Sequence, residues 1–132
     1  SCIAVRAQDG TVYEPSLGLF DRVLCDVPCS GLGVLRRKPE IKYRDEEAFG
    51  GLPALQYKIL ETAANYLNRD GMLVYSTCTI LPGENERVVS RFLREHPAFA
   101  PAPFGEDDWH STHLPEIGGG DGFFISRIRR VE

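Results

Sequence analysis

The sequence predicts an α/β protein built on a mostly parallel sheet that ends in an antiparallel hairpin. Apolar runs of strand length alternate with segments whose apolar residues recur at helical spacing, as expected of βαβ units. The 132 residues are 42% hydrophobic and 26% charged, which is the composition of a globular domain with one core. No run reaches the roughly 18 apolar residues that span a membrane, so we expect a cytoplasmic protein with no membrane partner.

Four apolar runs are expected to form strands, and turn-forming residues bound most of them. They are Cys2–Ala7, Phe20–Cys25, Gly71–Tyr75 and Phe123–Ile128. The second and third runs are expected to be buried parallel strands, which are covered on both faces. Proline cannot donate to a strand ladder, so Pro101 and Pro103 weaken the prediction of a strand over Phe99–Phe104.

Two segments carry the apolar period of a helix. The first runs from about Leu52 to Leu67, and the Asn68–Gly71 segment is expected to end it with a glycine cap. The second opens at Pro82–Glu86, where proline and acidic residues favour a helix start, and ends before Pro97.

The order of these elements resembles the second half of a doubly wound domain. No glycine-rich GxGxxG turn for binding a nucleotide is present. The glycines of Gly118–Gly122 precede a strand, so we expect a turn or hairpin there. Residues 1–132 are therefore expected to form a single partial domain that lacks an N-terminal cofactor motif.

Two cysteine motifs follow the two central runs, Asp26-Val27-Pro28-Cys29-Ser30-Gly31 and Ser76-Thr77-Cys78-Thr79. Neighbouring strands lie roughly 4.8 Å apart, so both thiols are expected to face one cleft at the carboxyl ends of the strands. Cys2 and Cys25 are expected to be core residues. We expect free thiols and, without a CxxC pair, no metal site. His110 and His113 are expected to pack in the hairpin rather than bind a metal.

A basic run follows the first cysteine motif, although the net charge of the chain is −4. Its members are Arg36, Arg37, Lys38, Lys42 and Arg44. Such a run is either a solvated charged loop or a surface for nucleic-acid phosphates. Its place beside the paired thiols favours the second interpretation.

The two cysteine motifs, together with Gly33-Val34-Leu35-Arg36-Arg37, Pro82-Gly83-Glu84-Asn85-Glu86 and Asp121-Gly122-Phe123-Phe124, resemble the RNA cytosine-5 methyltransferases of the Sun or RsmB type. The resemblance covers nearly the whole chain. It implies the C-terminal part of a Rossmann-like methyltransferase fold, S-adenosylmethionine as cofactor, and ribosomal RNA, 16S at the family level, as substrate. Transfer RNA is the alternative substrate.

The family's chemistry explains the two thiols. A thiolate that adds to carbon 6 of cytosine makes carbon 5 nucleophilic enough to take the methyl group. By resemblance, Cys78 is this nucleophile and Cys29 assists its release. DNA cytosine-5 methyltransferases attack from a Pro-Cys cysteine, so the chemistry alone leaves the two roles interchangeable.

The resemblance also assigns three residues to the cofactor, Asp9, Asp26 and Pro28, and Asp26 to the catalytic set as a contact to the base. Local sequence offers other roles, a cap for Asp26 and an Asx turn beside Gly10 for Asp9. RNA contact is expected from the basic run.

The chain alone is expected to be inactive, to bind S-adenosylmethionine poorly and to self-associate through an exposed sheet edge. A non-catalytic RNA-binding module that uses residues 36–44 is the competing function. A cysteine hydrolase or thiol oxidoreductase is disfavoured because the chain lacks a suitably placed histidine or a CxxC pair.

Overall fold

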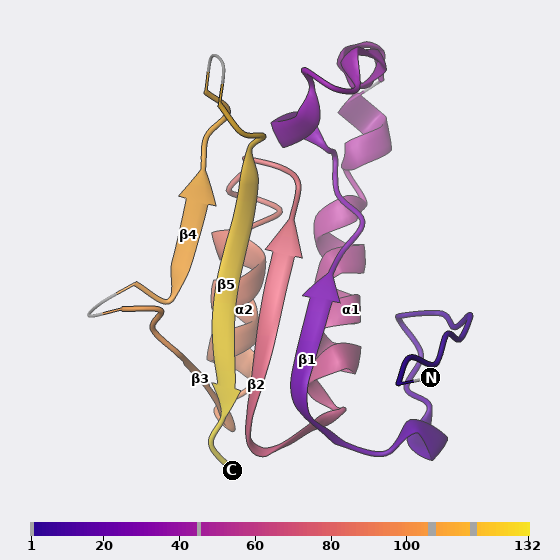
Figure 1. Ribbon diagram of the computed structural model, residues 1–132, viewed down its shortest axis with the longest axis vertical. Coiled ribbons are helices and arrows are strands. Elements are labelled where there is room, and N and C mark those ends of the chain that lie inside the picture. Colours follow the sequence, from indigo (N-terminus) through magenta and orange to yellow (C-terminus); the bar gives the residue numbers. More distant parts are fainter. Residues whose placement is uncertain (1, 45, 106–107, 117–118) are drawn as a thin grey trace.

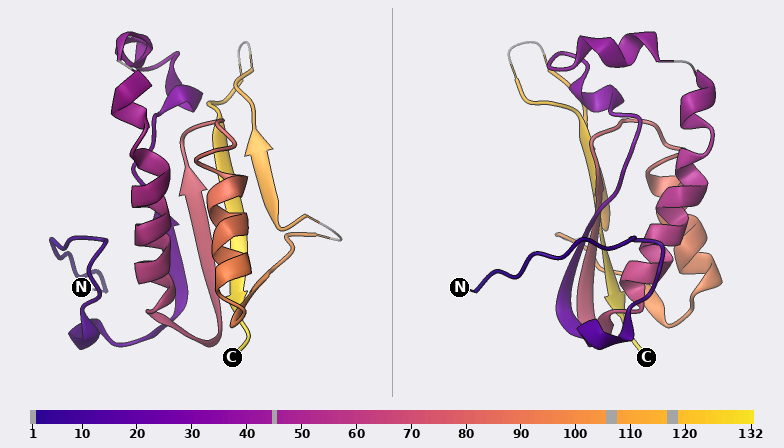
Figure 2. Two further views of the ribbon diagram at one scale, coloured as in Figure 1. Left: turned by 180° about the vertical axis from the view of Figure 1, so that it is seen from behind. Right: turned by 90° about the vertical axis from the view of Figure 1, so that its right-hand side faces the viewer.

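The computed structural model describes residues 2–44, 46–105, 108–116 and 119–132, so Gly118 of the expected hairpin turn lies outside it. The described residues form one mixed sheet with two α-helices on one of its faces (Figures 1 and 2). The strands are β1 (Phe20–Asp26), β2 (Leu67–Thr77), β3 (Phe99–Pro101), β4 (His110–His113) and β5 (Phe123–Arg130). The helices are α1 (Leu52–Ala64) and α2 (Glu86–Glu95). In the part of the chain that is described, neither helix is long and apolar enough to cross a membrane.

The sheet has the strand order β1-β2-β5-β3, with β4 also paired to β5. The expected βαβ unit is confirmed, because β1 and β2 are parallel and α1 connects them. The expectation that most strand pairs are parallel is wrong, since the other described pairings are antiparallel. The cause is β5, which returns from β4 in the expected terminal hairpin and inserts between β2 and the sheet edge.

The sheet edge beside β5 is made of two short pieces. Phe99 pairs with Arg130 at one end of β5, and His110 pairs with Ser126 farther along. The expectation that Pro101 and Pro103 disfavour a strand over Phe99–Phe104 does not hold for the first three residues, which form β3. Its physical reason still holds beyond them, because β3 ends at Pro101.

The Cys2–Ala7 segment is irregular and exposed rather than a strand, and Cys2 is not a core residue. A strand needs a neighbour to complete its ladder. In the described sheet β1 is an edge strand, so its outer side offers an open ladder that Cys2–Ala7 does not join. This open edge is the one that the expected self-association would use.

The end of α1 also differs from the sequence prediction. The helix stops at Ala64, and the Asn68–Gly71 segment lies inside β2. Phe20 pairs with Leu67 while Arg22 pairs with Met72, so the intervening residues of β2 form an irregular bulge. Asp70 takes a φ of 61° there. The turn-forming residues thus interrupt a strand ladder instead of capping a helix.

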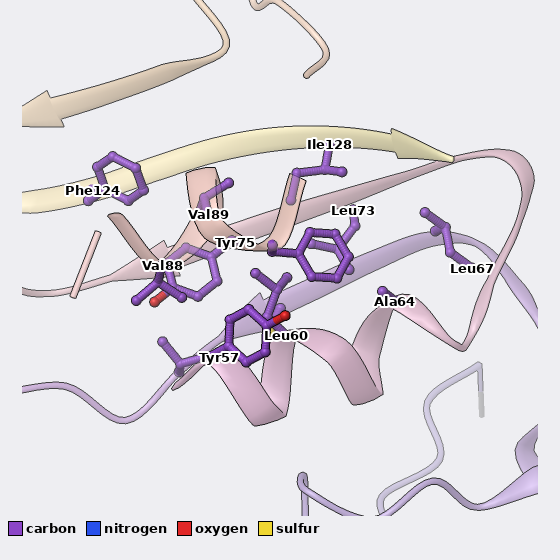
Figure 3. Close-up of a cluster of buried hydrophobic side chains, with 13 residues drawn as sticks. Tyr57, Leu60, Ala64, Leu67, Leu73, Tyr75, Val88, Val89, Phe124 and Ile128 are labelled. Atoms are coloured by element: carbon purple, nitrogen blue, oxygen red, sulfur yellow. The ribbon is translucent and has the colours of Figure 1, made fainter. Parts of the chain in front are cut away.

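The hydrophobic core lies between the sheet and the two helices (Figure 3). Leu60 of α1, Phe92 of α2, Leu73 and Tyr75 of β2 and Phe124 of β5 are almost fully buried. The opposite face of the sheet is open in the described structure, and Leu24 of β1 is 72% exposed there. The apolar run of β1 is therefore covered on one face only, although the sequence indicates a strand buried on both.

Replacement of Leu60 by alanine is expected to lower the free energy of unfolding by about 2–5 kcal/mol, because the side chain is fully buried and would leave a cavity. Leu55 of the same helix is 38% exposed, and Leu55→Ala is expected to change it by about 1 kcal/mol or less. Urea denaturation followed by circular dichroism measures both. Equal losses would contradict the position of the core.

Candidate active site

The two cysteine motifs meet where β1 and β2 end. Asp26 is paired with Ser76 at the carboxyl ends of these strands, and each strand is followed by a loop that carries a thiol. The Sγ atoms of Cys29 and Cys78 lie 3.1 Å apart, within hydrogen-bonding distance. The predicted juxtaposition of the two thiols is therefore confirmed. All four cysteines are free thiols, and Cys25 is buried in the core as expected.

The two thiols differ in their surroundings. Cys78 is exposed, whereas Cys29 is partly buried and its Sγ accepts a hydrogen bond from the Cys78 backbone N–H at 3.3 Å. The pKa of Cys29 is raised to about 12. The largest cause is burial, and the second is the hydrogen bond to the Cys78 side chain. Cys29 is therefore protonated at neutral pH and can donate its S–H to Cys78.

Asp26 lies at the same end of the sheet as the cysteine loops. Its carboxylate is exposed and accepts a hydrogen bond from the Ser76 hydroxyl at 2.8 Å. A cap was the other role left open by the sequence, and the partner of Asp26 here is instead the side chain opposite it on the neighbouring strand.

A buried polar layer beneath the thiols joins the two loops. The residue after each cysteine carries a hydroxyl, and those of Ser30 and Thr79 lie 2.8 Å apart with both residues fully buried. The Asn85 side-chain amide donates to the Thr79 carbonyl at 3.0 Å, and the Thr77 hydroxyl donates to Asn85 Oδ1 at 2.6 Å. Buried polar groups in such a layer must be paired to be stable, so these residues fix the two loops relative to each other. The sequence did not reveal them as components of the site.

Two glycines bring a third segment against the Cys78 loop. The Gly33 N–H donates to the Cys78 carbonyl at 3.0 Å, and the Gly122 N–H donates to the Gly33 carbonyl at 2.8 Å. A Cβ at Gly33 would collide with the Gly122 carbonyl oxygen and lie 2.8 Å from that of Cys78. Only a glycine allows this approach, so the start of β5 is held to both cysteine loops.

The basic run divides into two groups. The Arg37 Nε pairs with Asp121 at 2.9 Å, and the Arg36 guanidinium donates to the Gly119 carbonyl at 2.7 Å. These two residues therefore hold the connection before β5. Lys38, Lys42 and Arg44 are exposed around the buried side chain of Ile41, which anchors their loop.

Asp9 lies in an exposed turn rather than at a strand end. Its Oδ1 accepts hydrogen bonds from the Thr11 hydroxyl at 2.7 Å and the Thr11 N–H at 2.9 Å, and these bonds hold the pKa of Asp9 below its usual value. The Asx turn left open by the sequence is thus formed. A cleft of about 260 Å³, lined by Gly10, Asp26 and Tyr66 among others, adjoins this turn.

The other residues with a predicted role lie as follows. Pro28 is exposed in the Cys29 loop. His113 stacks on Phe123 with ring centroids 4.3 Å apart, and His110 packs against Trp109, in agreement with packing in the hairpin. Within the described ranges, no group of three or more histidine, cysteine and carboxylate side chains could hold a metal ion.

Solved structures of similar fold include a methyltransferase homologue. The chain matches a methyltransferase homologue from Pyrococcus horikoshii with a TM-score of 0.67 at 27% identity, over 88% of this chain and 41% of the other. It matches NSun6 from the same organism, solved with SFG, with a TM-score of 0.66 at 28% identity, over 83% and 29% of the two chains. The fold is thus that of a methyltransferase.

The family model of the 16S rRNA methyltransferases RsmB/F matches residues 1–129, so the chain belongs to this family. The ribosomal RNA small subunit methyltransferase B of Photorhabdus laumondii is 45% identical over 113 residues, covering 84% of this chain and 26% of the relative. The probable enzyme of that name in Bacillus subtilis is 41% identical over 124 residues, covering 84% and 28%. The chain therefore spans less than a third of the length of these relatives.

Gly33→Ala is expected to lower the melting temperature by about 5 °C or more, because its Cβ would displace two backbone carbonyls. Gly83 lies near the same loops with nothing within 4 Å of its Cβ position, so Gly83→Ala is the matched control and is expected to leave the melting temperature nearly unchanged. Calorimetry of both variants tests the close contact. A Gly33→Ala protein as stable as the control would contradict it.

Iodoacetamide is expected to alkylate Cys78 well before Cys29, because a thiol with a pKa of about 12 holds little thiolate at neutral pH. The rate at Cys29 is expected to keep rising from pH 7 to pH 10. Cys78→Ala removes a hydrogen bond and a charge that raise this pKa, so the rate at Cys29 should increase at every pH in that range. Mass mapping, with exposed Cys2 as the internal reference, measures these rates. Reaction of Cys29 as fast as Cys2 at pH 8 would count against its sheltered state.

Proposed function

We propose that this chain carries the catalytic centre of an enzyme that methylates carbon 5 of cytosine in 16S ribosomal RNA, with S-adenosylmethionine as methyl donor. The observation that supports this proposal most strongly is the 3.1 Å approach of Cys29 and Cys78 at adjoining strand ends, in a member of the RsmB/F family. The reaction would take place in the cytoplasm.

The proposed reaction begins when the Cys78 thiolate adds to carbon 6 of cytosine. The electron pair gained by the ring makes carbon 5 a nucleophile, which takes the methyl group from the sulfonium of the cofactor. A base then removes the proton from carbon 5, the double bond re-forms, and the carbon–sulfur bond to Cys78 breaks. The exposure of Cys78 supports its role as nucleophile, because the cytosine ring must reach the attacking sulfur.

Cys29 is assigned to the release of Cys78. Its protonated thiol lies against the Cys78 sulfur, where it can donate to the thiolate that leaves carbon 6. The exposed Asp26 carboxylate, oriented by Ser76, suits the exocyclic amine of cytosine or the amino group of the cofactor.

The cofactor is proposed to lie in the cleft between the Gly10 turn and the end of β1, which Asp26 lines. Asp9 and Pro28, each close in the sequence to a residue that lines this cleft, are proposed to contact the cofactor from the two ends. The P. horikoshii NSun6 structure holds SFG, an analogue of S-adenosylmethionine. This chain supplies no glycine-rich cofactor turn, so we expect the 132 residues alone to bind the cofactor weakly and to be inactive.

The RNA is proposed to cross the exposed Lys38, Lys42 and Arg44, which lie on the loop that follows Cys29. Contacts of this kind neutralise phosphates and position the strand without reading its sequence. Arg36 and Arg37 would contribute by holding this loop to the connection before β5. A non-catalytic RNA-binding module would use the same surface.

The roles of the two thiols are tested in a chimera in which this chain replaces the matching segment of the B. subtilis relative. Cys29→Ala is expected to accumulate a covalent RNA adduct, seen on a denaturing gel, because addition proceeds and release fails. Cys78→Ala is expected to form none.

Cys2→Ala is the matched control, since this thiol lies outside the site, and should behave as the unaltered chimera. Adducts that form only through Cys29 would reverse the two roles. RNA binding without any adduct, in a chimera that binds the cofactor, would support the non-catalytic alternative.

A further inference from the structure

Both peptide bonds of Cys29 are held by buried side chains from other elements. The Gln56 Nε2 of α1 donates to the Pro28 carbonyl at 2.9 Å, and this carbonyl belongs to the peptide bond before Cys29. The Ser30 N–H, which belongs to the peptide bond after Cys29, donates to Glu84 Oε2 at 2.9 Å. Cys29 is thus fixed on its two sides by one residue each.

The two holding residues are also bonded to each other. Gln56 Nε2 donates to Glu84 Oε2 at 2.7 Å, so the two protons of this amide nitrogen serve the Pro28 carbonyl and the Glu84 carboxylate. The reversed amide would place an oxygen against both acceptors, and this fixes its orientation. Gln56 is 0% exposed and Glu84 is 3% exposed, so water cannot replace either partner.

The same pair is bonded to the strand that leads to Cys78. The Tyr75 hydroxyl of β2 donates to the Glu84 backbone carbonyl at 2.7 Å. A second link is the hydrogen bond between the hydroxyls of Ser30 and Thr79, which joins the two cysteine loops. The path from Gln56 through Glu84 therefore connects the Cys29 loop with the strand that leads to Cys78.

We propose that Gln56 and Glu84 are positioning residues that hold the Cys29 loop so that its thiol lies against the Cys78 sulfur. Besides the bond between them, the side-chain hydrogen bonds described for Gln56 and Glu84 go to the peptide groups on either side of Cys29 and not to the two sulfurs, so both residues act through those peptide groups. The catalytic meaning of this position, assistance to the release of Cys78, rests on the proposed function. The role of Gln56 and Glu84 in placing the Cys29 thiol against Cys78 does not depend on that function.

The alignment of the two thiols can be measured on the 132-residue chain with glutathione. Glutathione disulfide accepts two electrons and two protons from the Cys29 and Cys78 thiols, which yields their disulfide and two glutathione thiols. The equilibrium constant of this exchange increases as the two sulfurs are held closer and better aligned. Gln56→Leu removes both bonds of the amide, and we expect the constant to fall about tenfold or more.

The control is Leu60→Ala, one turn along α1, which removes core packing without touching the Cys29 loop. Measured on the folded fraction, its constant is expected to equal that of the unaltered chain. This readout separates positioning of the thiols from a general loss of stability.

Two substitutions of Glu84 decide the question if Gln56→Leu does not fold. Glu84→Gln keeps an oxygen that can accept from the Ser30 N–H, whereas Glu84→Leu keeps the bulk and loses the acceptor. The expected order of the equilibrium constants is unaltered chain, Glu84→Gln, then Glu84→Leu. A constant that stays native in Glu84→Leu, or that falls equally in Leu60→Ala, would overturn the proposal.

The thiol equilibrium involves neither RNA nor cofactor, so its outcome is independent of the adduct assay. A chimera that forms no adduct, with the glutathione results as expected, would reject the proposed function and leave the positioning role intact. The converse result, with adducts formed and the glutathione constants unaffected, would reject the positioning role alone.

Discussion

The parallel register of β1 and β2 is the constraint on which the candidate site depends. Asp26 lies opposite Ser76, so the two strands end at the same level and release their loops side by side. A shift of one strand by one residue would turn its last side chain to the other face of the sheet. The bulge at Asn68–Gly71 takes up the extra residues of β2 at the far end, which lets the pairing run unbroken from Met72 to the site.

Burial, more than charge, distinguishes two thiols that lie in contact. Cys29 is sheltered by the loop that Ser30 pulls into the interior, and Cys78 stays at the surface because Thr79 takes the buried position next to it. The chemistry of Cys29 depends on its partner, since Cys78 is itself among the causes that raise the pKa of Cys29. One arrangement of hydroxyls beneath the loops thus creates unequal partners above them.

Periodicity in the sequence was sufficient for the βαβ unit, for the contact between the thiols and for the hairpin, because these follow from local patterns and from the geometry of parallel strands. It failed where the secondary structure of a segment depends on pairing with a neighbouring strand. Cys2–Ala7 has the pattern of a strand but joins no ladder in the described sheet, and the Asn68–Gly71 segment has the composition of a helix cap but is drawn into β2 by its pairing with β1.

The roles within the site show the same limit. Gln56 stands at an apolar position of the α1 period, and that misfit is the signal by which the sequence could have revealed it. Glu84 is indistinguishable in the sequence from an ordinary acidic residue at a helix start, and only the fold shows that it faces Ser30. Likewise, the pairing of Arg37 with Asp121 joins residues too far apart in the chain for any local pattern to indicate.

The two borders of the sheet have different capacities for extension. Beside β5, the border consists of the short β3 and β4, and Pro101 and Pro103 lie where the first of them ends, so a further strand would find little ladder to join. β1 offers a continuous ladder that ends at Asp26. The sheet can therefore grow in one direction only, and any strand added there would also build a wall of the cleft beside Gly10 and Asp26. A strand that joined this edge, from this chain or from another, would therefore extend the sheet and reshape the cleft at the same time.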